Sequence, residues 1–336
     1  MKRISNNLII RKFIYYKYNN MSMDSLITFA LRKKYESIEK IGDPLADIGT
    51  LFNWERVRPL LGDMYNNKSE EGGRPNFDEI LMIKALVLAQ WYGLTDKALE
   101  REISDKVSFM NFLGFPEKAP DSSTIWLFRE RLIKTGKYNL VWDEINNQLD
   151  SLGLVIKKGV IQDATFITSD PGHAKADKPR GDEAKTRRSK DGTWAKKGSK
   201  SSFGYKLHSK VDTEFGLIRD LETTTASLHD SQVDLSNEGE IVYRDKGYFG
   251  AEANGYSATM NRATRGHPLS IQDEMRNQRI SKKRAPVERH YAVIKRVFGA
   301  AHVMVTTVAR VHVKMVFTAI AFNLFQLRTL KKQNVI

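Results

Sequence analysis

The stretch Val160 to Ile167, Val-Ile-Gln-Asp-Ala-Thr-Phe-Ile, places Asp163 in the middle of an apolar, β-branched run. Such a run is typical of a buried strand, where a carboxylate costs free energy unless a positive group lies against it. A similar pattern occurs at Ile241 to Tyr248, Ile-Val-Tyr-Arg-Asp-Lys-Gly-Tyr, in which Asp245 ends the apolar run. The two stretches predict two strands that each present an acid.

A third acid, Glu288, opens a helical pattern that extends from residue 284 to 295. Pro286 suits the first turn of a helix, because the N–H that proline lacks has no helical partner there. Helical spacing predicts an apolar stripe with Glu288 and Lys295 beside one another on its border, two turns apart. The stripe consists of Val287, Tyr291, Ile294 and Phe298. We therefore expect Glu288 to face the edge of the sheet rather than open solvent.

Acids from two strands and one helix can converge on a pair of divalent cations. Oxygen ligands suit Mg²⁺ or Mn²⁺, which keep coordination positions open for phosphate and water. Two such ions can clamp the attacking and leaving oxygens of a phosphoryl displacement. Each acid taken alone could instead be a paired structural residue. The nearby Asp212, Asp220 and Asp230 are expected to play no part in such chemistry.

Composition favours an anionic polymer as the partner. The 336 residues include 54 Lys and Arg against 40 Asp and Glu, a formal net charge of +14. This balance favours nucleic acid, although ribosomal and membrane-surface proteins share it. The absence of cysteine excludes disulfides, cysteine-bound zinc and thiol nucleophiles. No apolar run reaches the roughly 18 residues of a membrane-spanning helix, so the segment from Met315 to Leu327 predicts a buried helix.

The N-terminal half shows helical periodicity. A Gly-Gly-Arg-Pro turn at 72 to 75 precedes a helix capped by Asp78, and Thr95 and Asp121 are expected to cap two more. The last of these helices carries basic residues and could enter a DNA major groove, although basic helix faces are often only solvated. These basic residues are Arg129, Arg131, Lys134 and Lys137.

From Lys157 onward the pattern changes to strands, which predicts an α/β fold, a mixed sheet with flanking helices, preceded by an all-helical region. The polar stretch from Asp170 to Ser202 should be mobile when free. We expect its Arg187, Arg188, Lys196 and Lys197 to follow a phosphate backbone. The expected organisation is a disordered leader at 1–22, a helical DNA-binding domain at 23–150 and a catalytic domain at 151–336 with a basic loop at 170–202.

Several linked motifs resemble the DDE transposases of bacterial insertion sequences, and most closely the IS-five group. They are Asp-Ala-Thr at 163 to 165, Phe-Gly-Tyr-Lys-Leu-His at 203 to 208, Tyr-Arg-Asp-Lys-Gly-Tyr at 243 to 248, and the spacing of Arg284, Glu288 and Lys295. The resemblance implies an RNase H-like fold in which Asp163, Asp245 and Glu288 bind Mg²⁺ or Mn²⁺. It also implies that Arg284 and Lys295 contact DNA. The family's signature has tyrosine where this chain has Ser281.

The resemblance implies a transposase that binds the terminal inverted repeats of its insertion sequence and catalyses metal-dependent cleavage and strand transfer. Its partners would be double-stranded DNA, both element ends and target, and a second copy of the chain in a homodimer or larger assembly. We expect a cytoplasmic, nucleoid-associated protein without membrane contact. Tyr248 is expected to touch DNA near the cut or to pack internally. The alternatives are a transposase-derived DNA-binding protein without catalysis and an RNase H-like nuclease without strand transfer.

Overall fold

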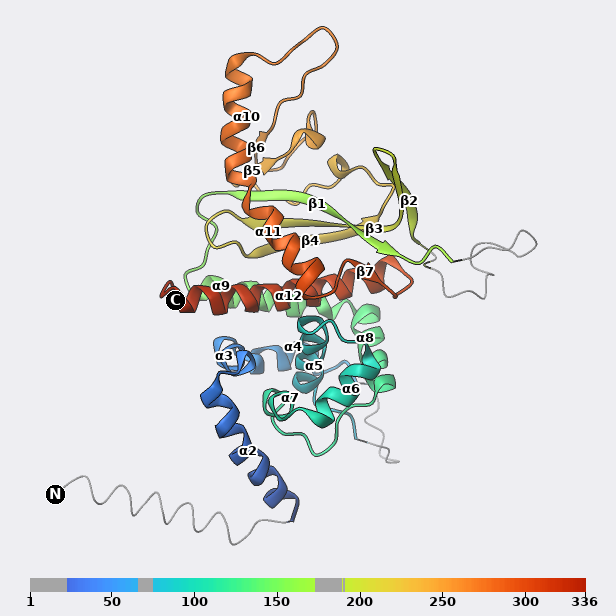
Figure 1. Ribbon diagram of the computed structural model, residues 1–336, viewed down its shortest axis with the longest axis vertical. Helices are drawn as coiled ribbons and strands as arrows, with labels where there is room; N and C mark the ends of the chain where they lie inside the picture. Colours follow the sequence, from blue (N-terminus) through green and yellow to red (C-terminus); the bar gives the residue numbers. More distant parts are fainter. Residues whose placement is uncertain (1–22, 66–74, 173–188, 190) are drawn as a thin grey trace, which may run out of the picture.

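The structure is a computed structural model that describes residues 23–65, 75–172, 189 and 191–336 (Figure 1). The expected leader at 1–22, Arg187 and Arg188 lie outside the described residues. A helical region comes first and a mixed sheet follows. The helices of this region are α2 (Met23–Ile41), α3 (Pro44–Leu51), α4 (Arg58–Leu61), α5 (Glu79–Trp91), α6 (Asp96–Asp105), α7 (Val107–Phe112), α8 (Ser122–Thr135) and α9 (Lys137–Ser151), with the 3-10 turn η1 (Trp54–Val57) before α4.

Short polar side chains begin three of these helices, as the sequence predicts. Asp78, Thr95 and Asp121 each accept a hydrogen bond from the backbone N–H three residues later, at the starts of α5, α6 and α8. Each bond satisfies an N–H that has no partner inside its helix. Gly93 follows α5 with φ of 62°, and a Cβ there would lie 3.3 Å from the carbonyl oxygen of Phe298. The turn after α5 therefore requires glycine.

The sheet is mixed and follows α9. Its main path runs β2–β3–β1–β5–β6, while β4 pairs with β3 and β7 pairs with β1. Strand β3 is antiparallel to β1, β2 and β4, whereas β5 is parallel to both β1 and β6. The strands are β1 (Val160–Ser169), β2 (Thr193–Lys197), β3 (Lys200–Asp212), β4 (Ile218–Thr225), β5 (Ile241–Arg244), β6 (Tyr256–Thr259) and β7 (His302–Val303).

Setting aside the short β2 and β7, three antiparallel strands, β4, β3 and β1, are followed by the parallel strands β5 and β6. A mixed sheet of this order with helices packed on it, preceded by a helical region, confirms the predicted fold class and is consistent with an RNase H-like domain. The two strands that the sequence predicts around Asp163 and before Asp245 both form, as β1 and β5.

The C-terminal part supplies the helices that cover the sheet. The 3-10 turns η2 (Asp230–Gln232) and η3 (Lys246–Tyr248) lie in the connections before and after β5, and α10 (Ile271–Arg284) extends away from the body in Figure 1. Next come α11 (Pro286–Ala292), the π-helical turn η4 (Val293–Val297) and α12 (Val308–Lys332). As predicted, α11 begins at Pro286, and the apolar stripe of Val287, Tyr291, Ile294 and Phe298 is buried.

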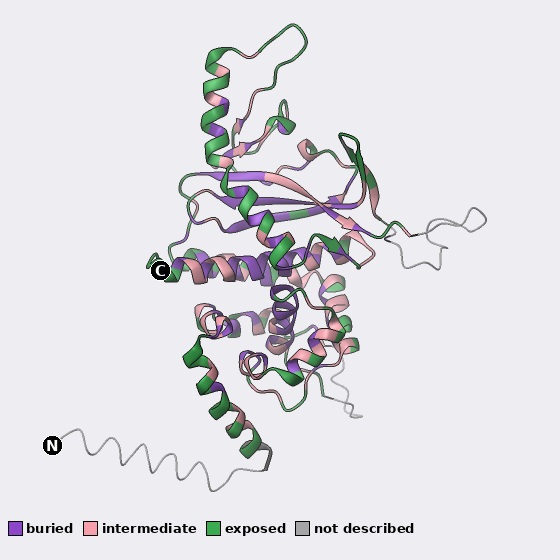
Figure 2. Ribbon diagram, in the orientation of Figure 1, coloured by how far each residue is buried: buried purple, intermediate pink, exposed green. Residues whose placement is uncertain are grey.

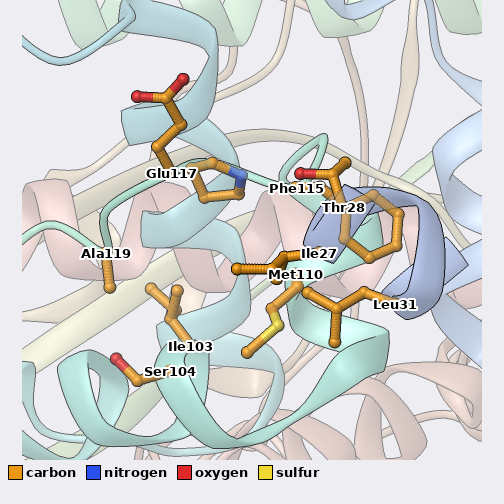
Figure 3. A pocket seen from close by; sticks show the side chains of 10 residues that line it. Ile27, Thr28, Leu31, Ile103, Ser104, Met110, Phe115, Glu117 and Ala119 are labelled. Carbon is orange, nitrogen blue, oxygen red and sulfur yellow. The ribbon is translucent and has the colours of Figure 1, made fainter. Parts of the chain in front are cut away.

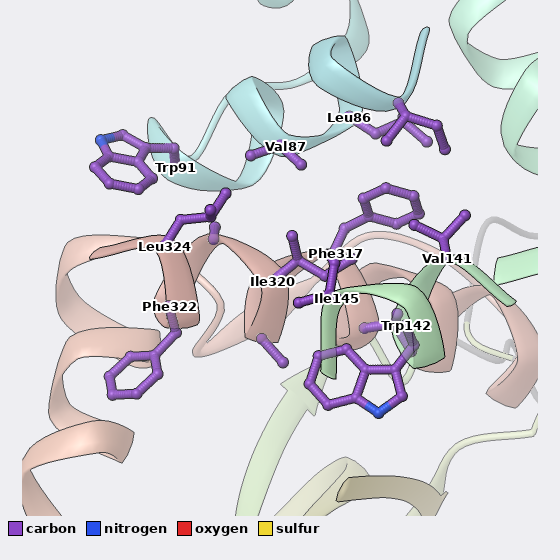
Figure 4. Packing of buried hydrophobic residues seen from close by; sticks show 14 of the residues in the cluster. Leu86, Val87, Trp91, Val141, Trp142, Ile145, Phe317, Ile320, Phe322 and Leu324 are labelled. Carbon is purple, nitrogen blue, oxygen red and sulfur yellow. The ribbon is translucent and has the colours of Figure 1, made fainter. Parts of the chain in front are cut away.

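Helix α12 joins the helical region to the sheet. It lies between them in Figure 1 and is buried over most of its length in Figure 2. In Figure 4, Phe317 and Ile320 of α12 lie between Leu86 of α5 and Trp142 of α9. Among the described helices α12 alone has the length and apolarity of a membrane span, yet 67% of its apolar window is buried in the protein. The helix is therefore a core element, as predicted for Met315 to Leu327, and it extends beyond that segment.

Two parts of the chain differ from the sequence-based expectations. Part of the polar stretch from residue 170 to 202, expected to be a loop, forms a hairpin, in which Trp194 of β2 pairs with Phe203 of β3 and packs edge-on against its ring. The sequence-based assignment also missed α10, a strongly polar helix whose signal is the capping box of Ser270 and Asp273.

Buried histidines make the fold sensitive to acid. His208 is fully buried and bonds to Thr224, and burial lowers its pKa from 6.5 to about 4. The unfolded state therefore binds the proton first as pH falls below 6.5, and stability is lost between pH 6.5 and 4. We expect His208 to remove about 2 kcal/mol from the free energy of unfolding between pH 8 and 5.

Urea unfolding at the two pH values measures this difference. The His208→Gln protein should show a pH-dependent loss about 2 kcal/mol smaller than the wild type. His267 is exposed, and the His267→Gln protein should keep the wild-type loss. Equal losses in all three proteins would contradict the assignment to His208.

Candidate active site

Asp163 occupies the middle of β1, opposite Ser209 of β3. Because side chains alternate along a strand, it shares its face of the sheet with the buried Ile161. Two hydrogen bonds fix it: Tyr291 Oη of α11 donates to the Asp163 carbonyl oxygen at 2.6 Å, and the Ala164 N–H donates to Asp163 Oδ1 at 2.9 Å. The acid is thus held at a fixed place on the helix-covered face.

Asp245 follows β5 and caps η3, with its Oδ1 accepting the Gly247 N–H at 2.8 Å. Strand β5 runs parallel to β1, with Ile161 paired to Tyr243. Asp245 lies one residue past the end of β5, and its carboxylate adds to the upward shift of the Asp163 pKa. The fold therefore brings the two acids within electrostatic range of one another.

Arg284, the last residue of α10, supplies the positive charge against this pair. Its Nη2 donates to Asp163 Oδ2 at 3.1 Å, and the two side chains are 15% and 21% exposed. Its Nε has no hydrogen-bond partner among the described residues. The guanidinium therefore neutralises Asp163 and keeps a donor that a phosphate oxygen could accept from.

The electrostatics of Asp163 are those of a desolvated carboxyl. Burial raises the pKa of Asp163 to about 6, the guanidinium of Arg284 opposes the shift, and the carboxylates of Asp245 and Asp230 add to it. A second positive charge at this place would thus be stabilised by the existing negative charges. The chemistry of the donors, all of them oxygen, suits a hard divalent cation.

Glu288 does not join these two acids in the structure. Its side chain on α11 is exposed, which corrects the expectation that it faces the sheet edge. Helix α10 ends at Arg284 and α11 begins at Pro286, and the two helices run in different directions in Figure 1. Among the described residues, no group of three or more His, Asp or Glu side chains is arranged to hold a metal ion.

Tyr248 packs inside the protein. Its side chain is 1% exposed, so the ring cannot touch DNA in this structure. Of the two expected roles, Tyr248 has the one of internal packing. Its Oη has no hydrogen-bond partner within the described part of the chain. Burial together with the charges of Asp163, Asp230 and Asp245 raises the pKa of Tyr248. The buried hydroxyl therefore lies within electrostatic range of the acids.

The remaining basic candidates lie in several places. Lys295 is half-buried in the π-helical turn η4, a type of irregularity that is frequent at functional sites. Arg129 forms two hydrogen bonds with Asp96, and Arg131 lies over the ring of Tyr65. These intramolecular contacts occupy both arginines in the free protein, and their contact with DNA stays a prediction.

A groove of about 500 Å³ is lined by Ala164, Thr165 and Phe166, the residues that follow Asp163 on β1. Its walls come from the β2–β3 hairpin and from the segment at η2, and they carry three lysines and one acid. The charged side chains are Lys196, Lys200, Lys206 and Asp230. Lys196 is exposed, and the side chain of Lys197 lies outside what the structure describes.

A second cavity, of about 290 Å³, lies in the helical region between α2, α6 and α7 (Figure 3). Ile27 and Leu31 of α2 face Ile103 and Met110 across it. Its lining is mostly apolar with one acid, Glu117. Since it lacks paired acids and basic residues, it offers no chemistry to a phosphodiester.

One contact near the acid pair escaped the sequence-based prediction. Tyr291 was assigned only to the apolar stripe, yet its hydroxyl holds the Asp163 backbone. Asp212, expected to play no part in the chemistry, is buried and accepts hydrogen bonds from the N–H groups of its own turn. That Asp212, Asp220 and Asp230 are not needed for the chemistry stays a prediction.

Comparison with known families matches most of the chain in two segments. The model described as a transposase domain (DUF772) matches residues 33–131, which lie in the helical region. The model described as a transposase DDE domain matches residues 156–324, which include the sheet, α10, α11 and most of α12. No solved structure matches the chain.

The pairing of Arg284 with Asp163 makes a prediction about stability without added metal. The Arg284→Gln protein leaves a desolvated carboxylate within electrostatic range of Asp245 but without its counter-charge, and we expect a loss of about 1–3 kcal/mol in urea unfolding in EDTA at pH 7.5. Adding Asp163→Asn should recover part of that loss, because the charge itself is removed.

The neighbouring Lys283 is exposed and provides the matched control. The Lys283→Gln protein should unfold like the wild type. If Arg284→Gln were as stable as this control, the arginine would not compensate Asp163.

Proposed function

The chain belongs to the transposases with a DDE domain, and from this premise we propose that it moves an insertion sequence of the IS-five group. It would bind the terminal inverted repeats of the element and catalyse metal-dependent cleavage and strand transfer. The observation that carries the proposal is the pair of acids, Asp163 within β1 and Asp245 directly after the parallel strand β5, with Arg284 against Asp163.

Transposases with a DDE domain typically use divalent metal ions, and the residues here fit such an ion. Asp163 and Asp245 would supply oxygen ligands, and the buried Tyr248 hydroxyl, within electrostatic range of both, has no hydrogen-bond partner among the described residues. We propose that Mg²⁺ or Mn²⁺ is held by Asp163, Asp245 and Glu288. For Glu288 to take part, α11 must turn or shift relative to α10. When bound, the metal would activate the attacking oxygen and stabilise charge on the phosphate.

The reaction consists of two displacements at phosphorus. In the first, a water oxygen bonds to the phosphorus at the element end and the bond to the 3′ oxygen breaks, which leaves a 3′ hydroxyl and a 5′ phosphate. In the second, that hydroxyl attacks a target phosphodiester and displaces a target 3′ oxygen. Arg284 and Lys295 would donate to the phosphate oxygens at both steps, since their fixed positive charges offset the charge of the phosphate.

The DNA path proposed for the catalytic region follows the groove of about 500 Å³. Its lysines Lys196, Lys200 and Lys206 come from the β2–β3 hairpin, and Arg187, Arg188 and Lys197 are close to them in the sequence. In the helical region, Arg129 and Arg131 on α8 would contact DNA only if their present partners released them. We propose that two copies of the chain assemble on double-stranded DNA in the bacterial cytoplasm, associated with the nucleoid.

A second candidate function rests on Glu288. Because this acid is exposed and apart from the other two, the chain could bind DNA without cutting it. An RNase H-like nuclease without strand transfer would share the site of the transposase. Cleavage and joining assays on labelled element ends separate the three functions.

The acid triad makes the central prediction. Changing Asp163, Asp245 or Glu288 to its amide should lower cleavage of an element end by at least about a thousandfold, because metal catalysis supplies several kcal/mol of transition-state stabilisation. Binding of the end should persist. Ca²⁺ should support binding without cleavage, because its longer and looser coordination misplaces the reacting oxygens.

The control is Asp220→Asn, which changes an acid of β4 whose charged neighbours are Lys210, Glu240 and Asp143. It should cleave like the wild type. Cleavage by Glu288→Gln at near the wild-type rate would remove Glu288 from the site and leave the other two assignments standing.

The groove lysines make a prediction about salt. Each neutralised phosphate contributes roughly 0.9 to the log–log slope of DNA affinity against salt, so Lys196→Ala with Lys200→Ala should flatten the slope by about 1.8. Fluorescence anisotropy with specific and unrelated duplexes should show equal weakening for both.

The control removes the same charge elsewhere. Lys331 and Lys332 are exposed at the end of α12, and replacing both with alanine should leave the slope within about 0.3 of the wild type. Equal slopes for the two double variants would place the DNA outside the groove.

A further inference from the structure

A buried chain of hydrogen bonds ends at the backbone of Asp163. Ser209 of β3 is the register partner of Asp163, so the two side chains lie on the same face of the sheet. Ser209 Oγ lies 3.0 Å from His290 Nε2 and 2.9 Å from Tyr291 Oη. Tyr291 Oη in turn donates to the Asp163 carbonyl oxygen at 2.6 Å. Strands β1 and β3 and helix α11 are therefore joined at the residue that carries the acid.

The members of this chain are shielded from solvent. Ser209 is 0% exposed, His290 is 2% exposed and Tyr291 is 8% exposed. The His290 ring also packs edge-on against Phe322 of α12, with the ring centroids 5.9 Å apart. In such surroundings a hydrogen bond is electrostatically strong, and a polar group that loses its partner is costly. The chain therefore links the core around α12 rigidly to Asp163.

The direction of donation along the chain follows from counting protons. The three contacts need three protons, each of the two hydroxyls supplies one, and the Asp163 carbonyl supplies none. The remaining proton must lie on Nε2 of His290. His290 thus donates to Ser209, Ser209 donates to Tyr291, and Tyr291 donates to the carbonyl oxygen. His290 Nδ1 has no hydrogen-bond partner among the described residues, which agrees with a proton on the other ring nitrogen.

We propose that Ser209 and His290 are positioning residues for Asp163 and act on it through the hydroxyl of Tyr291. Neither residue would touch metal or DNA. They hold the Asp163 backbone and the second half of α11 in one fixed relation, and displacement of a reacting group by about 1 Å can cost about a hundredfold in rate. This inference rests on the proposed function. Since the chain fixes α11 from His290 onward, a movement of Glu288 toward the acids would occur in the part of the helix before His290.

Nuclear magnetic resonance of the full chain, labelled with ¹⁵N at histidine and free of DNA and metal, tests the direction of donation. The wild type should show His290 with a proton on Nε2 and none on Nδ1, and the His290→Gln spectrum assigns these signals by their loss. Ser209→Ala should shift the Nε2 signal, because the acceptor is removed. A wild-type ring protonated on Nδ1 and not on Nε2 would overturn the inference.

Cleavage kinetics test the positioning role. Ser209→Ala should lower kcat for cleavage of an element end by about tenfold to a hundredfold and leave KM unchanged, because the acid is misplaced while no DNA contact is lost. His290→Gln places an amide N–H where Nε2 lies and should keep kcat within about threefold of the wild type. His290→Asn is too short to reach Ser209 and should lose as much as Ser209→Ala. A purely structural role predicts equal losses for the two His290 variants.

Ser169 provides the matched control. It lies on β1 like Asp163, it is buried, and its Oγ has no hydrogen-bond partner in the described part of the chain. Ser169→Ala should therefore keep the wild-type kcat. Circular dichroism and urea unfolding in EDTA check that each variant is folded under the assay conditions.

The outcomes separate this inference from the proposed function. Wild-type kcat in Ser209→Ala, or equal losses in His290→Gln and His290→Asn, would remove the positioning role and leave the proposed function standing. If the wild type cleaves no element end, the proposed function fails together with the positioning role, and the resonance experiment alone then decides whether the hydrogen-bond chain exists.

Discussion

The site depends on how the protein compensates the desolvated charge of Asp163. A carboxylate in the middle of a strand, within electrostatic range of a second one, is tolerable only with positive charge close by. Arg284 provides that charge from the end of α10, and Tyr291 holds the backbone of the acid from α11. Asp163 is therefore the residue that α10, α11 and the β1–β5 pair all position or neutralise.

The site in turn depends on the core that α12 builds. This helix packs on β4 as well as on α3, α5, α8 and α9, so the helical region and the sheet share one apolar cluster. The predicted domain boundary between residues 150 and 151 therefore divides the sequence, but the two parts do not have separate hydrophobic cores. A DNA contact in the helical region and the acids on the sheet would be held on one framework, because a shared, close-packed core moves as a unit.

Sequence patterns predicted the parts of the site that local chemistry determines. The apolar runs around Asp163 and Asp245 predicted their strands, and Pro286 with its stripe predicted α11. The exposed position of Glu288 could not be predicted, because it depends on the break between α10 and α11 and not on spacing within one helix. The place of Asp230 depends on how the connections η2 and η3 pack, which no periodicity encodes. The β2–β3 hairpin is held by backbone pairing, which the polar composition of this stretch does not indicate.

Arg284 pairs with Asp163 and is also expected to contact DNA, and electrostatics can explain both roles. In the free protein its guanidinium is paired with Asp163, whereas the resemblance to DDE transposases implies a contact with DNA. A dication bound at the acids would take over the neutralisation of Asp163, and like charge would then repel the guanidinium from the cation. The nearest negative group left to it would be the phosphate of the bound strand. The arginine would thus stabilise the empty site and recognise DNA once the site is filled, with one side chain and a small change in position.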